Sequence, residues 1–203
     1  DYKPARSAAG YNSPFALRVI DSQNLFAAQA VSAAEAVRLR EAGLNLQQIR
    51  ERLDHLIPNV HGYLVPRDLY YMRARARHKG DRSVSLFSAA LGSALDIKPV
   101  IHSRGGQTAP SAKIKGFEPA CERLFAFAIE RISVGLLSPT LCVSYGGELS
   151  ELRALPGYDA LRSHCKANAV ELLESVMSLT GMINVGKGAV TLAFADDKAP
   201  VFH

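Results

Sequence analysis

The stretch that decides the fold is KGDRSVSLFSAALGSALDIKPVI, from Lys79 to Ile101. It opens with a basic glycine turn, continues through an apolar segment rich in small residues, and ends in a short β-prone run. We expect a helix in its middle, because a serine can cap the helix start and apolar residues recur at helical spacing. Pro99 cannot continue a helix, so the chain should leave it extended and enter Val100–Ile101 as a strand.

The expected helix has a thin apolar face, because alanine, glycine and serine interrupt its larger side chains. Such a face allows close approach, either by another helix or by the hydrocarbon of a ligand. The sequence leaves both possibilities open. If a ligand lies there, the candidate contact residues are Leu86, Ala90, Ser93 and Ala94.

Short motifs stand in a fixed order around this stretch. They are Val19-Ile20-Asp21-Ser22, Leu69-x-Tyr71-Met72-Arg73, Lys79-Gly80-x-Arg82, the run from Ala89 to Pro99, Lys113-x-Lys115-Gly116, and Asn184-Val185-Gly186-Lys187-Gly188-Ala189. In this order the motifs resemble the DegV family of fatty-acid-binding proteins. The matches extend along nearly all of the 203 residues.

The resemblance implies an α/β fold of two domains. Residues 1–59 would be the C-terminal part of a first, parallel-sheet α/β domain. Residues 60–203 would form a second, mixed α/β domain with a largely antiparallel sheet. The chain would begin inside the first domain, and the serine and threonine with which the family holds a fatty-acid carboxylate would be missing.

The resemblance also implies a function. The protein would bind a long-chain fatty acid between two domains and present its carboxylate to a partner fatty acid kinase subunit, which makes acyl phosphate. It would not be an enzyme itself and would use no cofactor beside the bound fatty acid. Arg82 and Lys115 match the basic positions that face the kinase in this family. A bacterial, cytoplasmic protein is expected.

The glycine loop near the C-terminus departs from the family pattern. By resemblance, Asn184, Gly186, Lys187 and Gly188 would contact the ligand, with Asn184 in the place of a histidine that helps to bind the carboxylate. An asparagine amide can donate a hydrogen bond but carries no charge and does not titrate near neutrality. Lys187 could supply the missing positive charge.

The same loop permits a competing interpretation. Gly181–Lys187 matches most of a phosphate-binding P-loop, in which backbone amides and a lysine neutralise phosphates. Against this, Gly188 replaces the hydroxyl residue that binds magnesium, and a strand rather than a helix should follow. The competing function is an α/β enzyme or a nucleotide- or phosphometabolite-binding module that uses this loop with Asp21, Ser22 and Lys98. A third possibility is an interaction protein whose lipid site has decayed.

Composition limits the remaining possibilities. With 48% hydrophobic and 21% charged residues, the 203-residue chain can bury one substantial core or two small ones. We expect no membrane span and no secretory signal, because charges interrupt every apolar run. The three cysteines are widely spaced and odd in number, which indicates reduced thiols.

The net charge of +5 is unevenly placed, with the densest basic cluster between Arg73 and Arg82. This cluster indicates an acidic partner or simply a solvated turn. It contains no interleaved aromatic residue for base stacking, so nucleic acid is not expected. The histidines are scattered, so neither a metal site nor a catalytic triad is predicted, and His61 and His102 are interpreted as structural.

The rest of the chain predicts alternating helices and strands. Helices are expected at residues 2–9, 24–42, 46–56, 69–77, 117–132 and 148–167, the last interrupted at Pro156-Gly157. Strands are expected at residues 16–20, 60–65, 100–101, 107–115, 141–145 and 189–194. Residues 170–173 are ambiguous by periodicity, and the resemblance favours a strand.

Overall fold

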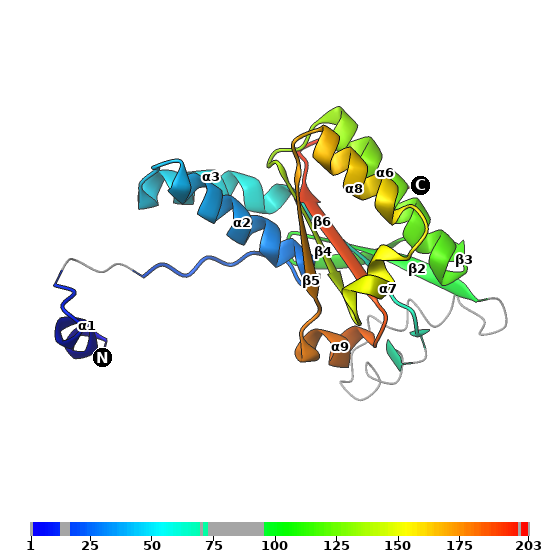
Figure 1. The fold of residues 1–203 in the computed structure, drawn as a ribbon, viewed down its shortest axis with the longest axis horizontal. Coiled ribbons are helices and arrows are strands. Elements are labelled where there is room, and N and C mark those ends of the chain that lie inside the picture. The colour runs from blue at the N-terminus through cyan, green and yellow to red at the C-terminus, as the bar shows by residue number, and fades with distance from the viewer. Residues whose placement is uncertain (1, 13–16, 70, 73–95, 199, 203) are drawn as a thin grey trace.

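The computed structural model describes residues 2–12, 17–69, 71–72, 96–198 and 200–202 (Figure 1). Their framework is a six-stranded sheet in the order β3-β2-β1-β6-β4-β5. Its strands are β1 (Val60–Val65), β2 (Ile97–Arg104), β3 (Gln107–Lys115), β4 (Thr140–Tyr145), β5 (Glu171–Val176) and β6 (Val190–Ala195). All neighbouring pairs are antiparallel except β4 and β5, which run parallel. The expected mixed and largely antiparallel sheet is therefore confirmed.

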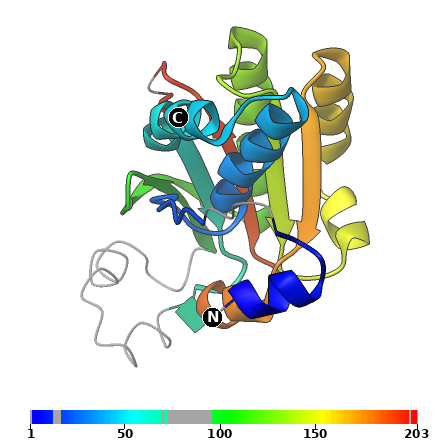
Figure 2. The same cartoon turned by 90° about the vertical axis from the view of Figure 1, so that its left-hand side faces the viewer.

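Two helical layers enclose this sheet. On one face lie α2 (Ala27–Glu41) and α3 (Leu46–Leu56), and on the other lie α6 (Phe117–Val134), α7 (Leu149–Arg153) and α8 (Tyr158–Ala167) (Figures 1 and 2). A short 3-10 turn, η1 (Ile57–Asn59), joins α3 to β1. Two further helices of the described ranges are α1 (Lys3–Ala8), which buries none of its residues, and α9 (Leu179–Val185), which lies at one end of the sheet.

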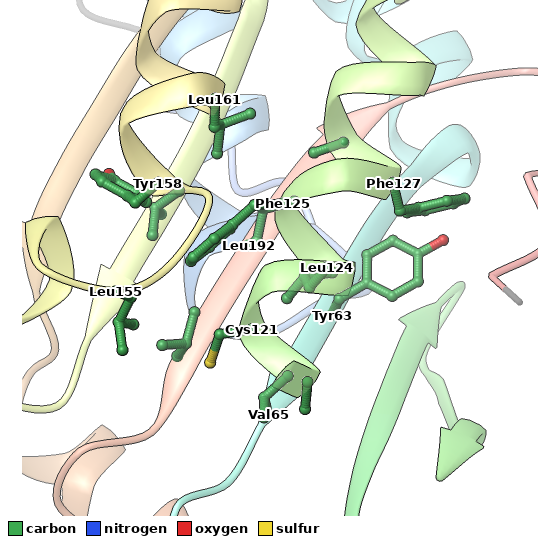
Figure 3. Packing of buried hydrophobic residues seen from close by; sticks show 14 of the residues in the cluster. Tyr63, Val65, Cys121, Leu124, Phe125, Phe127, Leu155, Tyr158, Leu161 and Leu192 are labelled. Atoms are coloured by element: carbon green, nitrogen blue, oxygen red, sulfur yellow. The ribbon is translucent and has the colours of Figure 1, made fainter. Parts of the chain in front are cut away.

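The larger core lies between the sheet and the second helical layer. Figure 3 shows how side chains of α6, α8, β1 and β6 fill this space. Leu124, Phe125 and Leu192 are fully buried, and the ring of Phe125 meets that of Tyr158 edge to face at 5.1 Å between centroids. Each such apolar side chain contributes roughly 1.5–3 kcal/mol to folding by leaving water. The apolar spacing of α6 is thus explained by the packing of one helix stripe onto the sheet.

Several predicted elements match the structure closely. The α3 helix begins at its predicted cap, because the Asn45 side chain accepts hydrogen bonds from the backbone of Gln47 and Gln48. The hairpin of β2 and β3 turns at Gly105 and Gly106, both of which have positive φ. The interruption at Pro156-Gly157 separates α7 from α8, and the ambiguous segment after residue 170 forms β5.

Other expectations are wrong. Leu17–Ile20 is extended but pairs with no strand of the described chain, because a β-prone sequence forms a strand only where a partner strand is available. The helix expected from residue 24 begins at Ala27, since Phe26 has a φ of +50°. Val37 of α2 and Leu46 of α3 are exposed, although the helical spacing of the apolar residues would place both on the buried faces of their helices. The helix expected at residues 69–77 is not among the wrong predictions, since its described residues Leu69, Tyr71 and Met72 are helical.

The first helical layer shares its core with the sheet. Ala28 and Val31 of α2 and Leu53 of α3 pack with Val60 of β1 and Ala193 of β6. The division into residues 1–59 and 60–203 stays a prediction, and any such division must accommodate this shared core. Within the described ranges, no helix combines the length and the apolar character needed to cross a membrane.

A buried carboxylate fastens α2 to its neighbours. Glu35 is fully buried, and its two carboxylate oxygens accept bonds from Arg38 and from the Ser138 hydroxyl at 2.7 to 2.9 Å. Arg52 of α3 adds a weaker ion pair at 3.6 Å. Burial raises the pKa of Glu35, but the hydrogen bonds and the two arginine charges outweigh burial and lower that pKa overall. The carboxylate therefore stabilises the fold above about pH 4.5, and this contribution is lost as the pH falls.

Replacing this carboxylate should destabilise the protein. We expect Glu35→Ala to lower the free energy of unfolding by about 3 kcal/mol, because the buried Ser138 hydroxyl and the arginines lose their acceptor. Urea denaturation measures this change. Glu41→Ala, at the exposed end of the same helix, is the matched control, and an equal loss in both variants would contradict the interpretation.

Candidate functional site

Several segments meet at the end of the sheet where α9 lies (Figure 1). The end of β1, the end of β4 and the start of β6 are joined there, since Val190 pairs with both Val65 and Tyr145. The loop Gly186–Gly188 connects α9 to β6. The start of β2 lies nearby, because Lys98 Nζ donates a hydrogen bond to the carbonyl oxygen of Arg67 at 2.8 Å.

The α9 helix has defined ends. Its N-cap residue, Ser178, accepts a hydrogen bond from the Gly181 amide through its side chain, and Gly186, with a φ of +89°, ends the helix. Asn184 therefore lies in the last turn of α9, not in the glycine loop to which the family resemblance assigns it. Its side-chain amide donates to the carbonyl oxygen of Thr180 at 2.7 Å. The cap at Ser178 and the stop at Gly186, eight positions apart in the sequence, account for this short helix.

The two loop glycines leave space for two specific side chains. A Cβ atom at Gly186 would lie 3.3 Å from the ring of Tyr71, and one at Gly188 would lie 2.6 Å from Cδ of Arg67. Both glycines also have positive φ. Neither Tyr71 nor Arg67 was predicted as a site residue, because a glycine signals that space is needed without showing which side chain fills it.

An open pocket of about 530 Å³ lies beside the loop. The residues lining it are Arg67, Glu118, Tyr145, Glu151, Ala154, Leu155, Lys187 and Gly188. Two cations and two carboxylates thus face the same space. Tyr145 donates its hydroxyl to Glu151 at 3.0 Å, and burial together with this carboxylate raises the pKa of the phenol. The guanidinium of Arg67 lies over the Phe117 ring at 5.0 Å, which holds its charge at the pocket wall.

A sequence profile of the family described as "Uncharacterised protein, DegV family" matches residues 1–197. The chain belongs to the DegV family. A DegV domain-containing protein of Xanthomonas campestris pathovar campestris is 64% identical over 195 residues, which are 96% of this chain and 62% of that protein. The chain thus spans less than two thirds of the length of this relative.

Solved DegV structures share the fold. The fatty acid binding DegV family protein from Streptococcus agalactiae matches with a TM-score of 0.65 at 17% identity, covering 97% of this chain and 64% of that one. DegV, a fatty acid binding protein from Bacillus subtilis, matches with a TM-score of 0.66 at 20% identity, covering 96% and 65%. The expected DegV-like α/β fold is therefore confirmed.

The structure places only some of the predicted site residues of this DegV chain. Leu86, Ala90, Ser93, Ala94 and Arg82 lie outside the described residues. The described residues that flank them lie at the site, since Tyr71 contacts Gly186 and Lys98 bonds to Arg67. Lys187 and Gly188 line the pocket, whereas Lys115 is exposed at the end of β3.

Of the residues of the competing nucleotide site, Lys98 lies near the glycine loop, but Asp21 and Ser22 are not brought to it. Asp21 lines a different pocket, of about 280 Å³, with Arg18, Arg50 and Asp54. Lys98 Nζ is engaged by Asp96 at 3.0 Å and by the Arg67 carbonyl, and the Ser22 hydroxyl donates to the Asn24 carbonyl. A helix precedes the loop and a strand follows it, which is the reverse of a P-loop.

The two strand histidines lie at the other end of the sheet. His61 pairs in register with Phe194, four residues beyond the start of β6. Its Nε2 lies 3.0 Å from the Asp196 carbonyl oxygen, and its Nδ1 lies 2.9 Å from Nε2 of His102, whose ring is stacked on it. Because a carbonyl only accepts, His61 donates through Nε2 and accepts from His102 through Nδ1. Burial, then the nearby His102 and Arg104, lowers the pKa of His61 to about 4.

This buried histidine should make folding sensitive to acid. Unfolded His61 binds a proton near pH 6.5, whereas folded His61 does so only near pH 4, so the unfolded state binds more protons between these values. We expect the free energy of unfolding to fall by up to about 3 kcal/mol across this window. His61→Gln should flatten this dependence in urea denaturation from pH 7 to pH 4. The exposed His55 gives the control His55→Gln, and an unchanged slope in His61→Gln would contradict the assignment.

The cysteines and acidic groups form no reactive cluster in the part of the chain that the structure describes. Cys121, Cys142 and Cys165 are free and buried, and burial raises their pKa values to about 12, 12 and 11. No three His, Cys, Asp or Glu side chains of the described residues lie close enough to hold a metal ion.

Proposed function

We propose that this DegV chain binds a long-chain fatty acid at the α9 end of the sheet. In this proposal a partner fatty acid kinase subunit receives the carboxylate and makes acyl phosphate, and the DegV chain performs no catalysis. The observation that carries the proposal is membership of a family whose solved members include proteins described as fatty acid binding. The buried thiols agree with the reducing environment of a bacterial cytoplasm, where we place the protein.

The energetics favour retention by the hydrocarbon tail. Burying about fourteen methylene groups at roughly 0.8 kcal/mol each offers on the order of 11 kcal/mol before the costs of association. We assign the tail to the stretch around Leu86, Ala90, Ser93 and Ala94, because described residues on either side of it, Tyr71 and Lys98, contact Gly186 and Arg67. The polar groups at the loop would then determine orientation and head-group preference more than affinity.

The head group needs a donor or a cation, because a buried carboxylate is costly without one. The neutral Asn184 amide already donates within α9. Two cations, Arg67 and Lys187, line the pocket beside the loop. We therefore assign charge neutralisation of the carboxylate to these two residues.

Removing one loop cation should weaken binding modestly. We expect Lys187→Ala to lower fatty-acid affinity about two- to fivefold, since an exposed charge pair contributes less than 1 kcal/mol. Titration with a fluorescent fatty acid measures the change. Lys166→Ala, on the exposed side of α8, is the control. If Lys187→Ala bound the fatty acid as tightly as the wild type, Lys187 would not belong to the head-group site.

The kinase would meet a basic face. Lys115 is exposed at the end of β3, and it matches a basic family position together with Arg82, which lies outside the described residues. Lys113 is also exposed two residues before Lys115 on the same strand. A cluster of positive charges would attract an acidic patch on the partner. Neither nucleic acid nor a membrane is proposed as a partner.

The test is direct. The full chain is purified, its lipids are extracted, and mass spectrometry quantifies them against protein. A fatty acid present in equimolar amount supports the proposal. Protein that carries no fatty acid, takes none up, and instead binds ATP tightly would overturn it in favour of the nucleotide-binding function.

A further inference from the structure

The hydroxyl of Tyr71 caps the end of α9. The last four carbonyls of a helix have no donor within the helix and need an outside partner when they are not hydrated. Ile183 provides one of these carbonyls, and Tyr71 donates its phenolic hydroxyl to it at 2.7 Å. The bond joins residues 112 positions apart in the sequence. It therefore connects the segment after β1 to the helix before the glycine loop.

The ring of Tyr71 holds the same turn from a second side. Gly186 turns the chain with a φ of +89°, and a Cβ atom there would lie between 3.3 and 3.8 Å from three atoms of Tyr71. The ring therefore packs against bare backbone at the point where α9 becomes the glycine loop. The hydroxyl and the ring of this one side chain together position residues 183 and 186.

Tyr71 is itself held in place. Its amide donates to the Asp68 side chain at 3.2 Å. Arg67 lies across Gly188 with its aliphatic stem, and its carbonyl accepts a hydrogen bond from Lys98. The segment Arg67–Tyr71 is thus tied to both ends of the loop and to β2. A shift of Tyr71 would be transmitted directly to the loop that carries Lys187.

We infer that Tyr71 is a positioning residue for the head-group end of the lipid site, and this inference rests on the proposed function. The phenol fixes the C-terminal turn of α9, and so fixes where the loop presents its cation and its backbone amides to the carboxylate. The tyrosine acts through the loop and needs no contact with the lipid. About a third of the side chain is exposed, so water can partly replace the hydroxyl when it is removed.

The test uses Tyr71→Phe, which keeps the ring against Gly186 and removes only the hydroxyl. Dissociation rates are measured by stopped flow for palmitic acid and for hexadecanol, which has the same carbon chain and no charge. We expect the acid to leave the variant roughly three to ten times faster than the wild type, the change that loss of one hydrogen bond produces, and the alcohol to change less than twofold. Tyr11→Phe, at an exposed tyrosine far from α9 in the sequence, is the control.

Amide hydrogen exchange gives a second readout that needs no lipid. The Gly186 amide donates to the Met182 carbonyl at 2.8 Å, and we expect its exchange to accelerate in Tyr71→Phe but not in Tyr11→Phe. Unchanged exchange, an unchanged dissociation rate for the acid, or equal acceleration for acid and alcohol would each overturn the positioning role. Wild-type protein that binds no fatty acid would instead overturn the proposed function, while the exchange experiment would still decide whether Tyr71 holds the loop.

Discussion

The candidate site depends on the contact of two backbones with no side chain between them. Gly146, just beyond β4, donates its amide to the Ala189 carbonyl at 2.9 Å and accepts from the Gly188 amide at 2.8 Å. A Cβ atom at Gly146 would lie 3.0 Å from the Gly188 nitrogen. Because backbone cannot rotate away as a long side chain can, this junction fixes the glycine loop to the sheet. Lys187 directly precedes Gly188, so this junction also limits where the backbone of Lys187 can lie.

Each helical layer is secured by one buried carboxylate. Glu35 connects α2 to α3 and to Ser138, and Asp196, fully buried after β6, pairs with Arg131 of α6 at 2.7 Å. Such bonds contribute little net stability compared with apolar packing, but a shift of a helix that broke one would leave a buried charge without its partner, at a cost of several kcal/mol. The sheet end that carries the glycine loop is therefore held by a scaffold with a fixed geometry.

The sequence was sufficient to predict a helix or strand wherever its local pattern and the tertiary packing favour the same structure. Strand β1 was predicted with its bounds, and α3 was predicted to start at Leu46 after its Asn45 cap, because alternation and capping are local properties. Leu17–Ile20 was mispredicted since a strand requires a partner that local sequence does not reveal. For the site, the glycines were recognisable, yet Tyr71 and Arg67 fill their space from more than a hundred positions away. Asn184 was misplaced because one polar residue does not distinguish the last turn of a helix from the loop that follows.

The three buried thiols have a practical consequence for experiments on this protein. A thiol with a pKa near 11 or 12 stays protonated at neutral pH, and only the thiolate reacts readily with maleimides or oxidants. Cys121, Cys142 and Cys165 should therefore react only very slowly with such reagents while the chain is folded. A single cysteine introduced at an exposed position could then carry a fluorophore or spin label without removal of the natural ones, which makes the wild-type sequence a ready background for distance measurements.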